Sequence, residues 1–151
     1  MTLHIGFTGT RHGMSAEQFH MVRRLIIEAS DGEVFFAHHG DCVGADAEFH
    51  EICSTLCGQC LVTVHPGPIS DLSAGCTCTE RLAPQPHMRR NAAIVAASQV
   101  MIAAPYESEP QKRGGTWATI GMAVRALKRG SLRTLYVVGR DGVLLDHGAW
   151  P

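Results

Sequence analysis

Residues 9–13 (GTRHG) place a hydroxyl and a cation between two glycines, directly after an apolar run. Backbone amides in such a loop, together with Thr10 and Arg11, could receive the oxygens of a phosphate group. A second interpretation stays open, in which Gly9 and Gly13 only permit a tight turn and Arg11 lies in solvent. The loop on its own therefore indicates a phosphate site only weakly.

A second loop, residues 39–46 (HGDCVGAD), combines glycines with an imidazole and two carboxylates. Gly40 and Gly44 permit a ligand to approach the backbone closely, and we expect His39 to act as a neutral hydrogen-bond donor. Asp46 falls in the first turn of the next helix, where the helix dipole favours a carboxylate. It either caps that helix or binds ribose hydroxyls, as an acid does in dinucleotide-binding folds.

A third loop, residues 112–117 (KRGGTW), again precedes a helix. Gly114 and Gly115 would leave backbone amides free for a ligand, and Thr116 adds a hydroxyl. The ring of Trp117 either stacks on a base or packs the helix against the sheet.

Short apolar runs alternate with amphipathic stretches along the whole chain. The apolar runs predict strands at residues 3–8, 34–38, 61–64, 100–104 and 133–138. Helical periodicity predicts helices at 15–29, 45–56, 89–97 and from just after Gly115 to about 128, the first opening on residues that resemble a capping box at Ser15. Residues 68–86, which carry three prolines, predict a long loop. The pattern predicts an α/β fold, a three-layer Rossmann-like arrangement with a mainly parallel sheet of about five strands and helices on both faces.

The predicted sheet gathers these loops at one edge. In such folds, ligands lie outside the carboxyl ends of the strands, near the point where the strand order reverses. His65 and Pro105 also follow predicted strands directly and are expected at the same edge. Together the glycine-containing turns predict one pocket for a nucleotide or a nucleotide-derived ligand.

Length, charge and hydropathy indicate which classes of protein fit this sequence. With 151 residues, 45% of them hydrophobic, the chain fits one domain spanning residues 1–151. Thirteen basic and fourteen acidic side chains give a formal charge of −1, which lacks the electrostatic footprint of a nucleic-acid binder. No apolar stretch approaches the roughly 20 residues of a spanning helix, and the N-terminus shows no signal-peptide pattern. We expect a cytoplasmic protein that binds a small molecule, without membrane or nucleic-acid partners.

Six cysteines and nine histidines raise the question of a metal site. Cys53, Cys57 and Cys60 match the spacing that holds an iron–sulfur cluster in radical enzymes, but Cys53 falls in a predicted helix and those enzymes need a much larger barrel. A zinc site using Cys76 and Cys78 is only slightly better supported. We therefore expect reduced thiols, no metal and no cofactor.

Five strings match a known group of domains: GFTGTRHGM, HHGDCVGADAEFH, HPG, MRRNAAIVAASQVMIAAP and GGTWATIGMA. Over residues 3–140 the chain resembles the SLOG superfamily of Rossmann-like nucleotide-binding domains. It looks closest to uncharacterised bacterial and phage members that carry a GTWATI string. Wider relatives include the cytokinin-activating LOG phosphoribohydrolases, a DNA-processing protein, and ligand-sensing domains of antiphage systems.

The resemblance to LOG enzymes also suggests which residues act. Those enzymes cleave an N-glycosidic bond of a nucleoside monophosphate with an arginine and a glutamate. Arg90, followed by Asn91, matches the arginine in its spacing to Pro105, so we expect it to hold phosphate and to be removable with the fold intact. Gly121 stands where the glutamate should be. If the chain is a hydrolase, Asp41, Asp46 or Glu48 would have to replace that acid.

Two functions follow from the resemblance and stay open at this point. In the first, the chain senses or sequesters a nucleotide-derived signal of the ADP-ribose type, in conflict between phage and bacterium, without catalysis. In the second, it is a LOG-like phosphoribohydrolase. In both, we expect a homo-oligomer, a dimer or higher.

Overall fold

The computed structural model describes residues 2–56, 59–68, 73–76 and 78–151. The elements in chain order are β1 (Leu3–Gly9), α1 (Ala16–Ser30), β2 (Phe35–His39), α2 (Ala45–Thr55), β3 (Cys60–Val64), β4 (Glu80–Arg81), α3 (His87–Ala97), β5 (Val100–Ala104), α4 (Gly115–Arg129) and β6 (Thr134–Val137). The strands form one six-stranded sheet in the order β4-β3-β2-β1-β5-β6, and every neighbouring pair is parallel. This confirms the predicted α/β, Rossmann-like class.

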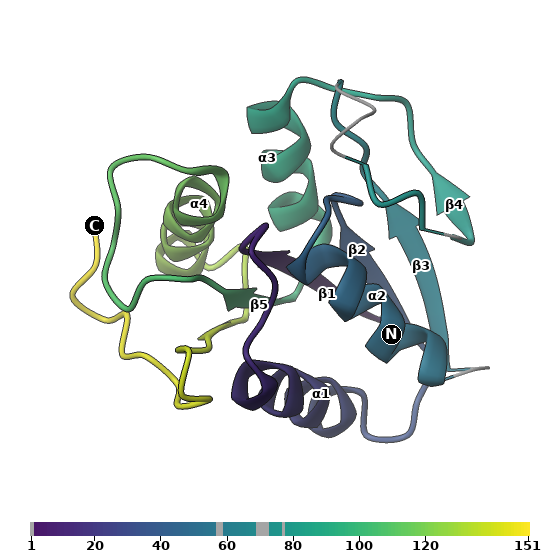
Figure 1. Cartoon of the computed structure of the whole chain (residues 1–151), viewed down its shortest axis with the longest axis horizontal. Helices are drawn as coiled ribbons and strands as arrows, with labels where there is room; N and C mark the ends of the chain where they lie inside the picture. Colours follow the sequence, from purple (N-terminus) through teal and green to yellow (C-terminus); the bar gives the residue numbers. More distant parts are fainter. Residues whose placement is uncertain (1, 57–58, 69–72, 77) are drawn as a thin grey trace.

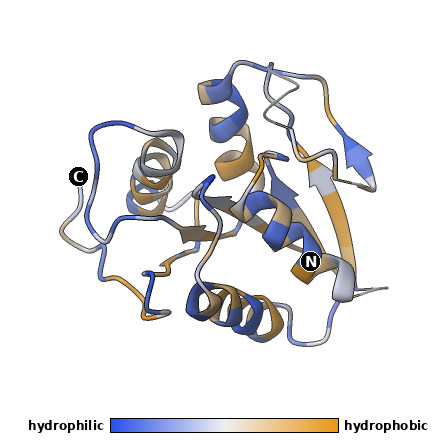
Figure 2. Cartoon of the chain, viewed as in Figure 1, coloured by the Kyte–Doolittle hydropathy of each residue, from blue (hydrophilic) through white to orange (hydrophobic). Residues whose placement is uncertain are grey.

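Helices cover both faces of the sheet, which gives three layers (Figure 1). α1 and α2 bury Ile26 and Phe49 against Ile5 and Phe7 in one hydrophobic core. α3 and α4 form a second core with the opposite side of β5 and β6. Each helix carries hydrophobic and hydrophilic residues side by side (Figure 2), as expected for a helix that buries one face.

The start of α1 connects that helix to the carboxyl edge of the sheet. Ser15 accepts a hydrogen bond from the Gln18 amide, and the Gln18 side chain accepts one from the Ser15 amide, so the predicted capping box is present. The fully buried Gln18 also donates its side-chain amide to the carbonyls of Pro105 and Val138. One polar side chain therefore ties α1 to the ends of β5 and β6.

The predicted loop at residues 68–86 differs from the expectation in one respect. Glu80 and Arg81 form β4, a two-residue edge strand that pairs with Thr63 and Val64. Both residues are exposed, so no apolar alternation marks them, and only the backbone pairing with β3 defines the strand. Residues 69–72 and 77 of this segment lie outside the described residues.

The strand order reverses beside β1. β2 lies on one side of β1 and β5 on the other, so the connections that leave β1 and β5 diverge to opposite faces. The amide of Thr10 still donates to the carbonyl of Ala104 at 3.1 Å, which keeps the ends of β1 and β5 together. Such a reversal is the usual place for a ligand in a doubly wound sheet.

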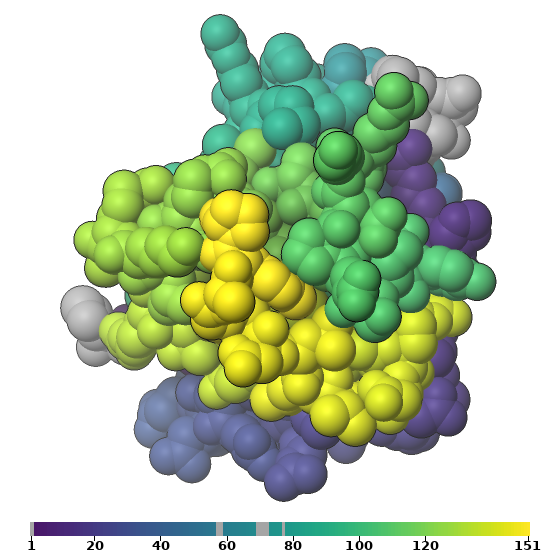
Figure 3. Space-filling model, turned by 90° about the vertical axis from the view of Figure 1, so that its left-hand side faces the viewer, coloured from purple at the N-terminus to yellow at the C-terminus, as the bar shows by residue number. Residues whose placement is uncertain are grey.

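The residues after β6 cover the free edge of that strand. The Leu145 amide donates to the Val137 carbonyl, and His147 donates to the Leu135 carbonyl. In Figure 3 these C-terminal residues (yellow) lie across one side of the molecule, next to the segment that follows β5 (green). This covering protects an edge that could otherwise pair with another chain. Among the described residues, no helix has the length and apolar character needed to cross a membrane.

Candidate functional site

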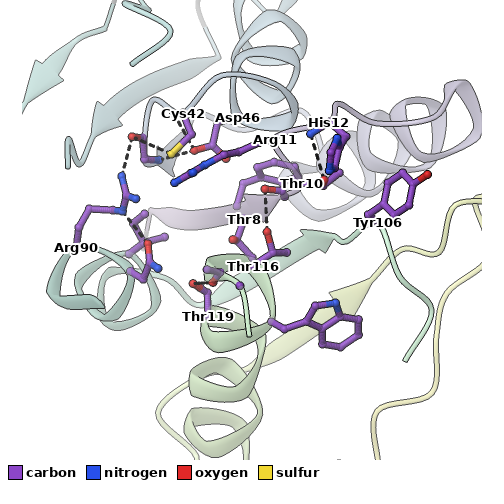
Figure 4. A pocket seen from close by; sticks show the side chains of 18 of the residues that line it. Thr8, Thr10, Arg11, His12, Cys42, Asp46, Arg90, Tyr106, Thr116 and Thr119 are labelled. Carbon is purple, nitrogen blue, oxygen red and sulfur yellow. Dashed lines mark hydrogen bonds between the residues drawn. The ribbon is translucent and has the colours of Figure 1, made fainter. Parts of the chain in front are cut away.

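A cavity of about 290 Å³ opens at the carboxyl edge of the sheet, where the strand order reverses (Figure 4). It is enclosed by the segments that follow β1, β2 and β5 and by the first turns of α3 and α4. The predicted binding residues that line it are Gly9, Thr10, Arg11, Gly40, Asp46, Arg90, Asn91, Gly114, Gly115, Thr116 and Trp117. Side chains far apart in the sequence thus meet in one space.

The loop after β1 is folded so that one cation is left free. A Cβ on Gly9 would lie 2.5 Å from the Cβ of Ala45, so only glycine allows β1 to approach α2 this closely. Thr10 is buried, and its hydroxyl oxygen accepts a hydrogen bond from the His12 amide at 3.2 Å. Arg11 is exposed and has no hydrogen-bond partner among the described residues. Figure 4 shows it extending across the cavity towards Asp46.

The N-terminus of α4 adds unpaired backbone amides. Gly114 adopts a φ of 105°, and the first helical hydrogen bond runs from the Ala118 amide to the Gly114 carbonyl. No side chain of the described residues caps this end, and none of them gives the amides of Gly115, Thr116 and Trp117 a partner, as at any uncapped helix start. The Thr116 hydroxyl donates to the Gly9 carbonyl at 3.0 Å, which fixes α4 against the loop after β1. These amides together with Arg11 suit an anion.

Asp46 organises the loop between β2 and α2. One of its carboxylate oxygens accepts hydrogen bonds from the amides of Gly40, at 3.1 Å, and Cys42, at 3.2 Å. Burial raises its pKa to about 6, although these two hydrogen bonds oppose the shift. The interpretation of Asp46 as a cap of its own helix is wrong, because no side chain caps α2 and both bonds go back to the loop.

Arg90 is a buried tie between three parts of the chain. Its guanidinium donates to the carbonyls of Gly40 and His65, to the side-chain oxygen of Asn91 and to Nδ1 of His87. These four bonds leave one of the five guanidinium N–H groups for a ligand. No carboxylate of the described residues forms an ion pair with it, although its charge acts to lower the pKa of Asp46. Arg90 therefore lines the cavity and also holds together the chain segments that form its wall.

Five of the predicted binding residues do not line this cavity: His39, Asp41, Gly44, His65 and Pro105. Gly44 begins α2 with a φ of 88°, and a Cβ there would lie 2.3 Å from the Arg11 carbonyl oxygen. Pro105 contributes a carbonyl to Gln18. Gly44 and Pro105 therefore support the loops around the cavity without lining it.

The neighbouring β2 residues His38 and His39 take part in two separate hydrogen-bonded groups of histidines. His39 pairs with His50, and His38 pairs with His65 and His4. His39 is fully buried, and burial together with nearby His50 lowers its pKa to about 3. Its Nδ1 accepts from the Asp41 amide, so the neutral ring carries its proton on Nε2 and donates to His50. His65 instead hydrogen-bonds His38, which in turn reaches His4. His39 is thus a donor to His50 rather than to the cavity.

The three carboxylates proposed to replace the missing acid are separated in the structure. Burial opposes ionisation of Asp41, but hydrogen bonds from Ser73, Cys76 and Arg81 together lower its pKa to about 2. Asp41 thereby holds the segment before β4. Glu48 accepts from the Met14 amide at 2.6 Å and does not line the cavity. Of the three, only Asp46 faces the cavity.

The aromatic ring available to a ligand is one that sequence reasoning missed. Trp117 is 6% exposed, packs against Trp150 and donates its indole N–H to Glu107. It belongs to the core around α4. Tyr106 is 51% exposed and lines the cavity, with the Arg140 guanidinium 4.8 Å from its ring centroid. Its place directly after Pro105, at the end of a strand, was the signal that could have identified it.

One group of side chains resembles a metal site. His39, His50 and Cys76 bring potential ligand atoms within 4.8 Å of one another. Both ring nitrogens of His39 already have hydrogen-bond partners, which leaves that ring no lone pair for an ion in this arrangement. The five described cysteines are free thiols, and Cys57 lies outside the described residues. That the protein uses no metal stays a prediction.

Comparisons with known proteins identify the fold. No protein-family model and no curated protein matches the chain. A molybdenum cofactor binding protein from the phototrophic bacterium Rippkaea orientalis has a similar structure, with a TM-score of 0.65, 15% identity, and coverage of 92% of this chain and 77% of that one. The Moco carrier protein from Chlamydomonas reinhardtii gives a TM-score of 0.57 at 17% identity, covering 93% and 77%. DNA processing protein A from Streptococcus pneumoniae gives 0.61 at 16%, covering 91% of this chain but 50% of that one. The chain therefore shares the Rossmann-like fold of these proteins.

Proposed function

We propose that the chain binds a phosphorylated small molecule derived from a nucleotide, of the ADP-ribose type, and holds it without cleaving it. The observation that carries this proposal is the meeting of an unpaired cation, Arg11, with the uncapped start of α4 in one cavity. Arg113 adds a second exposed cation to the lining. Amides at a helix start and a guanidinium are the groups that bind phosphate oxygens best.

A ring on the ligand would find a partner at the same site. Tyr106 is 51% exposed, with the Arg140 guanidinium over its ring and His12 beside it at a ring-centroid distance of 5.1 Å. Stacking on such a ring tolerates any planar base. A phosphate and a planar group therefore have complementary surfaces within one cavity, which favours a nucleotide over inorganic phosphate.

The arrangement of acids supports binding rather than hydrolysis. Cleavage of an N-glycosidic bond passes through a positively charged sugar, which a free carboxylate normally stabilises. Gly121 does not line the cavity, Asp46 is held by two backbone amides, and Glu107 accepts from Trp117. A LOG-like hydrolase is a second candidate, because Asp46 is a carboxyl group of raised pKa that faces the cavity.

The similar structures support a small-ligand role for this fold, since two of them bind or carry the molybdenum cofactor. The resemblance to ligand-sensing antiphage domains extends the proposal to a signal exchanged in conflict between phage and bacterium. We also propose that the protein acts as a homo-oligomer. Light scattering coupled to gel filtration measures that property independently of ligand binding.

Thermal unfolding with a panel of phosphorylated ligands tests the proposal. ADP-ribose at a hundred times its Kd should add about 2.7 kcal/mol of stability and raise the Tm by several degrees. The substitution Arg11→Ala should weaken this binding by about 1.5–3 kcal/mol, because it removes a charge-assisted contact. Arg23→Ala is the matched control, since Arg23 is also exposed but lies on α1 away from the cavity. The proposal fails if no nucleotide or phosphosugar shifts the Tm, or if Arg11→Ala behaves like the control.

A further inference from the structure

A second cavity of about 240 Å³ adjoins the first. Gly40, Cys42 and Arg90 line both, so these three residues form a shared boundary. Ligand sites usually enclose about 300–1,000 Å³. The first cavity is close to the lower end of that range, and the two together lie within it. Because they share these lining residues, we treat the two neighbouring cavities as two compartments of one site.

The second compartment has walls of a different chemical character from the first. Leu82 and Pro84 come from the segment after β4, and Pro66 follows β3. Arg81 donates to the Asp41 carboxylate at 3.1 Å, so these two charges pair with each other. Arg90, at the boundary with the first compartment, is the remaining cation of the lining. The apolar walls favour an uncharged, flat group.

One polar group in this compartment is available to such a ring. Nδ1 of His87 lies 3.1 Å from the Arg90 guanidinium, which can only donate. Nδ1 is therefore the acceptor, and the neutral imidazole must carry its proton on Nε2. Burial and the charge of Arg90 lower the pKa of His87, which keeps the ring neutral. Nε2 has no partner among the described residues, so its N–H can donate to a ring nitrogen or a carbonyl oxygen.

We propose that one ligand occupies both compartments, with its phosphate in the first and an uncharged heterocyclic ring in the second, where His87 donates to it. Arg90 lies between them and has one N–H left for the linking group. This inference rests on the proposed function and deepens it, because it places the planar group in the second compartment instead of beside Tyr106 and requires a ligand with two separated binding groups. A small phosphosugar would fill the first compartment alone.

Filling the second compartment with a larger side chain tests the inference. Leu82→Trp places an indole in that space, and Leu61→Trp is the matched control, because the two leucines are 39% and 37% exposed and Leu61 lines neither compartment. ADP-ribose and ribose 5-phosphate are the probes, measured by calorimetry. We expect Leu82→Trp to weaken ADP-ribose at least tenfold and to change ribose 5-phosphate less than twofold, while Leu61→Trp changes neither.

The possible failures are distinguishable. If neither probe binds the unmodified protein, the proposed function and this inference both fall. If ribose 5-phosphate binds but ADP-ribose does not, or if Leu82→Trp leaves ADP-ribose unaffected or weakens both probes equally, only the two-compartment site is overturned. Imidazole ¹⁵N spectra of the unmodified protein give a measurement that does not depend on the folding of a variant. ADP-ribose should shift the His87 signals and ribose 5-phosphate should not; unchanged signals with both would overturn the inference.

Discussion

Replacing Arg90 with alanine should destabilise the whole fold. Arg90 is 5% exposed and donates to carbonyls that follow β2 and β3, Gly40 and His65. Its removal would leave the His65 carbonyl and the Asn91 side-chain oxygen without this donor, and the Gly40 carbonyl with the Cys42 thiol alone. Each buried acceptor without a partner costs about 1–3 kcal/mol. These costs overlap, so we expect a loss of about 3–5 kcal/mol, a large share of the typical 5–15 kcal/mol stability of a domain.

Urea unfolding followed by circular dichroism measures this loss directly. Arg89→Ala is the matched control on the same helix, because Arg89 is exposed and has no hydrogen-bond partner among the described residues. Its free energy of unfolding should stay within about 0.5 kcal/mol of the unmodified protein. A change of less than 1 kcal/mol for Arg90→Ala would refute the structural role of this side chain. The sequence-based expectation of an arginine that can be removed with the fold intact would then stand.

The remaining predictions concern pH and catalysis. Burial lowers the pKa of His38 and His65 from 6.5 to about 4, and that of His39 from 6.5 to about 3. Between these values and 6.5 the unfolded chain binds more protons, so the free energy of unfolding should fall as the pH drops through this window. Asp46 opposes the trend, because its pKa is raised from 3.8 to about 6 and the folded state therefore binds its proton between these two values. Urea unfolding at pH 7 and pH 5 measures the net change in the free energy of unfolding. Equal or greater stability at pH 5 would contradict the expected loss. For catalysis, chromatography should detect no free adenine after hours of incubation of AMP with micromolar protein; release that Asp46→Asn abolishes would favour the hydrolase.

The sequence was sufficient for the fold class and for most of the elements. Residues 100–104 form β5 as predicted, and the capping box at Ser15 starts α1. These features are local, because a buried run or a cap depends on residues within one turn or one strand. β4 was not predicted, because no local pattern marks it. Glu80 and Arg81 become a strand only through backbone pairing with β3.

The location of the candidate site was also predictable, but the role of each side chain was not. Glycine-containing turns after parallel strands must meet at one edge of the sheet, and the cavity lies there. Which groups remain free there depends on partners distant in sequence. Asp41 is held by Ser73 and Arg81, and Trp117 packs against Trp150, whereas Arg11 is left unpaired. Only the tertiary structure decides this, because a hydrogen bond or a packed ring requires its partner to lie within a few ångströms, and one sequence gives no such distances.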